Sequence, residues 1–314
     1  MNMLNKKVIL TIITFLILLD ISLIGCIDNS GEKIGVLVTI VPQAEMVEFI
    51  GGNYIEVTIM VPAGESPHSF EPTPEQMKKV AVATAYFKVG SGVEFEVAQM
   101  DTILEQNPDL KVFDCSEDIT VISFDDHYVK KTHAEEEDDN EEEHEHDHEG
   151  TDPHIWTSPV NFKKMAEVVY NGLINIDPEH QTEYFSNYQA YISKLDTLHS
   201  NISSILQTYE NHSFMVYHPA WGYFADTYKL QMIAIEDEGK QPGPAGINAI
   251  ISQARAENIT VIFVAPQFDT SSAETIAGEI GGNVVYADPL MTDYRAAITK
   301  LAEDMVVGFE NKKI

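Results

Sequence analysis

Three histidines and one aspartate stand where metal ligands are often found in an α/β protein. His68 and His218 each come after an apolar run that predicts a β-strand, and Asp288 follows a third such run. His154 lies between a proline and a predicted helix. Prolines beside all four restrict the backbone and reduce the ordering that binding must impose. Three imidazoles and one carboxylate suit a tetrahedral zinc ion, so these residues predict a metal site.

Two other interpretations of the same residues stay open. Taken singly, each of these histidines is more often an ordinary surface or core residue than a ligand. A site of three histidines with one open position also describes a zinc hydrolase, in which the bound water has its pKa lowered to about 7. Such an enzyme needs a general base, and Glu71 is the only nearby candidate in the sequence.

An acidic, histidine-rich loop at residues 133–150 precedes His154. In Glu135–Glu149, eleven of fifteen residues are acidic and none is apolar, so the segment predicts a solvated loop rather than part of a core. His144, His146 and His148 fall within it, and imidazole and carboxylate are both zinc ligands. The loop is therefore either an auxiliary zinc collector or a solvating tract that happens to contain histidines.

The first 26 residues have the pattern of a lipoprotein signal peptide. Lys6 and Lys7 precede the apolar run Val8–Leu19, which is too short for a comfortable membrane span. The sequence LIGC that ends at Cys26 resembles a lipobox, in which the cysteine becomes the lipidated first residue after cleavage. An uncleaved N-terminal anchor is the alternative. Both place the folded part outside the cytoplasmic membrane.

Composition excludes some classes of partner. The formal net charge of −31 argues against nucleic acid. Cys115 is the only cysteine besides Cys26, so the mature chain has no intrachain disulfide. The roughly 290 residues after Cys26 are enough for one large or two medium domains. The acidic surface fits either attraction of cations or a high-salt environment, and a monomer is expected.

Alternating strand and helix signals predict an α/β fold of two lobes, at residues 33–177 and 212–314. Each lobe is expected to contain a mainly parallel four-stranded sheet flanked by helices. The predicted strands are Ile34–Ile40, Ile55–Val61, Tyr86–Val89, Val112–Asp114, Ser213–Tyr217, Leu230–Ile235, Thr260–Ala265 and Val284–Ala287.

One long helix is predicted between the lobes, over residues 178–209. Its apolar residues recur in steps of three and four from Tyr184 to Tyr209, which gives one continuous apolar seam. At ~1.5 Å per residue it would be roughly 48 Å long, more than a small lobe needs. It is interpreted as a rigid linker, and a long helix packed within one domain is the alternative.

Four motifs in order resemble a known family. They are SPHSFEP around His68, DPHIW around His154, HPAWGYF from His218 and YADPL around Asp288. Together they resemble the ZnuA-type solute-binding lipoproteins of ABC transporters, which bind zinc or manganese. The resemblance extends over residues 34–309, although a glutamate is common in the family where Ala265 stands.

The resemblance implies a function and a ligand set. It implies capture of Zn²⁺ in a cleft between two lobes by His68, His154, His218 and Asp288, and delivery to an ABC permease driven by a separate ATPase subunit. A histidine at position 218 goes with zinc in this family, whereas a glutamate there goes with manganese. A manganese- or iron-binding member of the family and a metal-binding surface adhesin are the alternatives. No G-x-x-x-x-G-K-[ST] motif occurs, so the chain itself is not expected to hydrolyse ATP.

Overall fold

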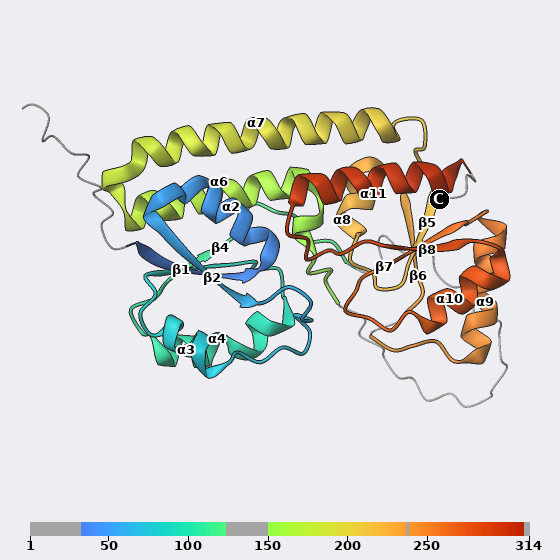
Figure 1. Cartoon of the computed structure of the whole chain (residues 1–314), viewed down its shortest axis with the longest axis horizontal. Coiled ribbons are helices and arrows are strands. Elements are labelled where there is room, and N and C mark those ends of the chain that lie inside the picture. Colours follow the sequence, from blue (N-terminus) through green and yellow to red (C-terminus); the bar gives the residue numbers. More distant parts are fainter. Residues whose placement is uncertain (1–32, 124–149, 237–238, 311–314) are drawn as a thin grey trace, which may run out of the picture. The chain divides into compact units, whose positions relative to one another are not determined.

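Two four-stranded parallel sheets form the framework of the protein. A computed structural model describes residues 33–123, 150–236 and 239–310, and Figure 1 shows how their elements are arranged. The strand order is β2-β1-β3-β4 in the first sheet and β6-β5-β7-β8 in the second. Every pairing between these strands is parallel. The predicted α/β class with two mainly parallel sheets is therefore confirmed.

The first sheet is built from apolar and β-branched runs that are buried by helices on both faces. Its elements are β1 (Ile34–Ile40), α2 (Val41–Gly51), η2 (Gly52–Tyr54), β2 (Ile55–Val61), α3 (Pro74–Val80), β3 (Ala85–Lys88), α4 (Glu94–Gln106) and β4 (Lys111–Asp114). Figure 1 shows α3 and α4 on the opposite side of the sheet from α2. The central strand β1 is buried from Val36 to Ile40, as expected for a parallel strand covered on both faces.

The second sheet repeats this order of strands. Its elements are β5 (Ser213–Val216), α8 (Gly222–Tyr228), β6 (Gln231–Ala234), α9 (Pro244–Ala256), β7 (Val261–Val264), α10 (Ser271–Ile280), β8 (Asn283–Tyr286) and α11 (Tyr294–Phe309). Both β5 and β7 are buried throughout. Loops at the carboxyl ends of such sheets are where ligands bind in open α/β folds.

Two consecutive helices connect the sheets. The turn η3 (Ile155–Thr157) leads into α6 (Pro159–Ile176), and the turn η4 (Pro178–His180) leads into α7 (Gln181–Leu206). Helix α7 packs against α2 and α6 beside the first sheet and against α11 beside the second, as Figure 1 shows. With 26 residues it is about 39 Å long. The linker helix is thus present and contacts helices of both sheets.

The predicted helix over residues 178–209 is shorter than expected because its first turn is a 3₁₀ turn. Asp177 accepts hydrogen bonds from the Nδ1 of His180 (2.7 Å) and from the hydroxyl of Tyr184 (2.5 Å). These contacts hold the chain in a tight turn before α7 begins. The predicted apolar seam is buried at Tyr184, Tyr191, Leu195, Leu198 and Ile202.

A local signal sets the start of α3, and a residue distant in sequence sets its end. Thr73 caps its start, because the Thr73 hydroxyl accepts a hydrogen bond from the backbone N–H of Gln76 (3.3 Å). The sequence predicts a helix over Pro74–Ala83, whereas the observed helix ends at Val80. There the side-chain amide of Asn107 donates to the carbonyls of Val80 and Ala83, each at 2.8 Å. A buried side chain distant in sequence thus replaces the last turn of the predicted helix.

One apolar core extends through both sheets and the helices between them. It includes Phe87 of the first sheet, Leu195 of α7 and Phe214 of the second sheet. The described residues from Ile34 onward accordingly form one compact unit. Among the described residues, no helix has the length and apolar character needed to cross a membrane.

Close packing between α6 and the first sheet predicts that Gly172→Ala lowers stability. A Cβ at Gly172 would lie 2.4 Å from the ring of Phe87, which is fully buried. Overpacking of this kind lowers the free energy of unfolding by about 1–3 kcal/mol. Urea unfolding of the metal-free protein measures this loss in the free energy of unfolding.

Gly278→Ala in α10 is the matched control. A Cβ at Gly278 meets nothing within 4 Å. Alanine should therefore raise the free energy of unfolding by about 0.5–1 kcal/mol, its usual advantage over glycine in a helix. A Gly172→Ala variant as stable as the wild type would contradict the close packing of α6 against Phe87.

Candidate metal centre

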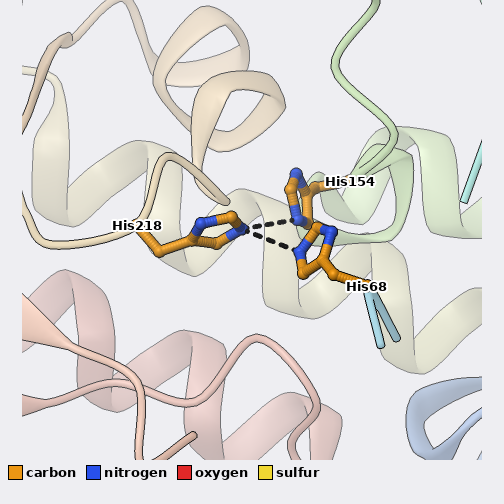
Figure 2. Close-up of side chains that lie close together, drawn as sticks. All are labelled: His68, His154 and His218. Carbon is orange, nitrogen blue, oxygen red and sulfur yellow. Dashed lines mark hydrogen bonds between the residues drawn. The ribbon is translucent and has the colours of Figure 1, made fainter. Parts of the chain in front are cut away.

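Three histidines from separate parts of the chain point their rings at one another. His68 lies in the loop after β2, His154 directly before η3, and His218 in the loop after β5. The Nε2 of His218 lies 3.2 Å from the Nε2 of His68 and 3.2 Å from the Nε2 of His154 (Figure 2). One ligand atom of each lies within 4.8 Å of the others. The structure thus brings together the three predicted histidines.

The spacing of these nitrogens fits a tetrahedral ion. Zn–N bonds of about 2.0–2.1 Å at tetrahedral angles place two ligand nitrogens about 3.3–3.4 Å apart. The two Nε2–Nε2 distances of 3.2 Å are close to that value. Three nitrogen lone pairs so close together repel one another unless a cation or a proton lies between them. The arrangement therefore favours binding of a small cation.

Each histidine is oriented by a carboxylate on its other ring nitrogen. The Nδ1 of His68 lies 2.9 Å from Glu94 and the Nδ1 of His154 lies 2.7 Å from Asp152. The Nδ1 of His218 is hydrogen-bonded to Glu236.

These contacts make Nδ1 the protonated nitrogen, so Nε2 presents its lone pair to the centre. The three carboxylates also supply negative charge close to the position of a bound cation.

Burial keeps one of the ligands neutral. It lowers the pKa of His218 to about 4, although the hydrogen bond to Glu236 opposes the shift. A neutral imidazole is the form that binds metal. Burial raises the pKa of Glu94, but the hydrogen bond from His68 and the electrostatic attraction of His68 together outweigh burial and hold that pKa below its usual value. Glu94 is therefore ionised at neutral pH.

The segment that carries His154 is fixed by residues near the second sheet. The hydroxyl of Tyr223 donates to the carbonyl of Asp152 (2.8 Å), and the hydroxyl of Tyr294 donates to the carbonyl of Trp156 (2.8 Å). The indole N–H of Trp156 donates to the carbonyl of Pro289 (2.7 Å). His154 itself is only 2 % exposed. Its position is therefore set by elements around the second sheet.

The histidines line a cavity of about 20 Å³. Its other lining residues are Ser66, Pro67, Trp156, Gln267, Phe268, Pro289 and Leu290. The ring of Phe268 stacks on that of His218, with 4.7 Å between the ring centres. A space of this size holds an ion or a water molecule, whereas pockets for organic ligands are typically about 300–1,000 Å³.

A larger cavity of about 320 Å³ lies elsewhere, at the amino ends of β5 and β7. His212 and Glu257 are among its lining residues. Of the acidic, histidine and cysteine side chains described, only His68, His154 and His218 form a group that could hold a metal ion. The small cavity is therefore the candidate metal centre.

Asp288, the predicted fourth ligand, lies beside this cavity but not in the three-histidine group. Its Oδ1 accepts hydrogen bonds from the side-chain amide of Gln267 (3.0 Å) and from the backbone N–H of Leu290 (2.9 Å). Its role as a ligand stays a prediction. Cys26, His144, His146 and His148 lie outside the described residues.

The sequence prediction missed the partners of the ligands. Glu236 lies two residues after β6, and Asp152 lies two residues before His154. Both positions therefore carried a signal, because acidic residues stand near a strand end or beside a ligand. Glu94 begins α4, where a carboxylate is favourable at any helix start. Only the fold shows which histidine each carboxylate faces.

Comparison with known proteins identifies the family of this chain. The family model described as "Zinc-uptake complex component A periplasmic" matches residues 36–307. The high-affinity zinc uptake system protein ZnuA of Bacillus subtilis is 27% identical over 287 residues, 91% of this chain and 86% of that protein. The manganese-binding lipoprotein MntA of Halalkalibacterium halodurans is 25% identical, covering 90% of each chain.

A crystal structure of ZnuA has the same fold. It superimposes with a TM-score of 0.78 at 31% identity, over 88% of this chain and 99% of that one. The family model spans nearly all of the described residues, including the three histidines. The chain belongs to the family of periplasmic component A proteins of zinc-uptake complexes.

Proposed function

We propose that this protein is the extracytoplasmic receptor of a zinc importer, in which His68, His154 and His218 hold Zn²⁺ as cargo. The observation that carries the proposal is the convergence of three Nε2 atoms within 4.8 Å of one another, with that of His218 at tetrahedral ligand spacing from the other two. The carboxylate behind each Nδ1 supports it, because such pairs fix the tautomer and raise the basicity of the ligand.

Zinc is the preferred cargo over manganese. An all-imidazole set favours zinc, whereas manganese prefers carboxylate, carbonyl and water oxygens. The relatives include both a zinc uptake protein and a manganese-binding lipoprotein, so family membership alone leaves the ion open. The three imidazole ligands of this chain support zinc rather than manganese. The metal content of protein purified without added metal tests it by mass spectrometry.

The remaining parts of the proposal concern partners and location. The receptor delivers its ion to an ABC permease that a separate ATPase drives, and it works as a monomer. A lipid on Cys26 anchors it at the outer face of the cytoplasmic membrane. Membership of a family described as a periplasmic component of an uptake complex supports this arrangement. Mass spectrometry of the membrane fraction would detect the lipidated cysteine.

We propose a binding role rather than a catalytic one. A cavity of about 20 Å³ leaves no room for an organic substrate next to the ion. Glu71, the candidate general base, is not among the residues that line the cavity. Esterase turnover by zinc-loaded protein would contradict this.

His154→Ala should abolish tight zinc binding, because it removes the most buried ligand. Isothermal titration with Zn²⁺ is expected to show one tight site in the wild type and a loss of at least about 100-fold in the variant. His199→Ala is the matched control, since His199 contacts Tyr228 outside the centre and zinc affinity should not change. Equal binding by His154→Ala and wild type would disprove the assignment.

The neutral state of His218 also predicts how metal-free stability depends on pH. Between about pH 4 and 6.5 the unfolded chain protonates this residue and the folded chain does not. The free energy of unfolding should therefore fall as pH drops through this range, by up to about 3 kcal/mol from this residue. Urea unfolding of the metal-free protein at several pH values measures this pH dependence. His218→Gln should show a shallower dependence, and an unchanged slope would show that His218 is not its cause.

Deletion of residues 135–149 tests whether the acidic loop is separate from the centre. The three ligands lie outside the deleted segment, so the tight site should keep its affinity. The total number of zinc ions bound should fall if the loop collects zinc, and stay the same if it only solvates. Loss of tight binding in the deletion variant would show that the two are not separate.

A further inference from the structure

Gln267 places a buried oxygen without a partner in the wall of the metal centre. It lies shortly after β7 and lines the same cavity as His68, His154 and His218. Among the described residues, its Oε1 is the one buried side-chain polar atom that has no hydrogen-bond partner. Buried acceptors are nearly always satisfied, so a lone one requires an explanation.

The orientation of this amide is set by Asp288. The Nε2 of Gln267 donates to the Oδ1 of Asp288 at 3.0 Å, and the same Oδ1 accepts from the backbone N–H of Leu290 at 2.9 Å. The opposite orientation of the amide would place its oxygen against a carboxylate oxygen, and the two would repel. The amide nitrogen of Gln267 therefore faces Asp288, and its oxygen points away from that carboxylate.

The rest of the cavity wall does not provide this partner. The indole N–H of Trp156 is already donated to Pro289, and the hydroxyl oxygen of Ser66 faces the backbone N–H of His68. Phe268, Pro289 and Leu290 line it with apolar atoms. Among the described residues no protein donor reaches Oε1, so its partner comes from outside the protein. A zinc ion held by three histidines keeps a fourth position, which water fills, and bound water is a strong hydrogen-bond donor.

We propose that Gln267 takes part in cargo binding by accepting a hydrogen bond from the water that completes the coordination of zinc. Asp288 is then a positioning residue, which aims the amide of Gln267 at that water. This inference rests on the proposed function, since it requires zinc at the three histidines. In this proposal Asp288 acts as a hydrogen-bond acceptor for Gln267 and does not coordinate the metal.

Variants at the two positions separate the roles. Gln267→Met keeps the length of the side chain but removes the oxygen, and should weaken zinc binding about 10–100-fold, the usual cost of losing a partner of the coordinated groups. Asp288→Asn keeps an acceptor for both Gln267 and Leu290, and should bind zinc nearly as wild type does. Asp288→Leu removes the acceptor and should weaken binding as Gln267→Met does. The double variant Gln267→Met/Asp288→Leu should bind zinc no more weakly than either of its single variants, because both changes remove the same contact.

Isothermal titration with Zn²⁺ and visible absorption of Co²⁺-loaded protein are the measurements, with urea unfolding of metal-free protein to confirm that each variant folds. Co²⁺-loaded Gln267→Met should keep a four-coordinate spectrum, because three histidines and a water remain. Wild-type affinity in Gln267→Met would overturn the proposal. A large loss in Asp288→Asn would also overturn it, since it would make the carboxylate itself a ligand. If His154→Ala binds zinc as wild type does, the proposed function fails instead.

Discussion

The metal centre depends on the hydrogen bond between each histidine Nδ1 and a carboxylate. Without Glu94, Asp152 and Glu236, each ring could present either nitrogen to the centre or rotate away. With them, three lone pairs face one another, and the Nε2 of His218 lies 3.2 Å from each of the other two, a distance that suits a shared cation. The free centre is electrostatically unfavourable because the lone pairs repel. A bound cation removes this repulsion and is balanced by the carboxylates behind the rings.

The fold brings these six side chains together because it joins two sheets of the same topology. His68 follows β2 and His218 follows β5, and these strands lie in different sheets of the same strand order. His154 lies in the connection between the sheets and is tied to residues near the second one by Tyr223, Trp156 and Tyr294. The core continues through α7 from one sheet to the other. A site built in this way is rigid around His154, whereas His68, with 28 % of its side chain exposed, is the ligand most open to solvent.

Much of this fold could be predicted from local sequence signals, and the limits have physical causes. Runs such as Ile55–Val61 are long and rich in β-branched residues, so their strands match the structure residue for residue. The histidines could be singled out because each stands beside a proline at the end of an element. The end of α3 could not be predicted, because it depends on Asn107, a residue 27 positions after Val80. The contact between Gln267 and Asp288 depends in the same way on the packing of two loops.

In the proposed function, three imidazoles and no other protein nitrogen or sulfur hold the cargo. Zinc K-edge X-ray absorption of the zinc-loaded protein tests this claim most directly. We expect a four-coordinate ion with three imidazole nitrogens at about 2.0–2.1 Å and one oxygen. Fewer than three imidazoles, or a sulfur in the coordination shell, would contradict it.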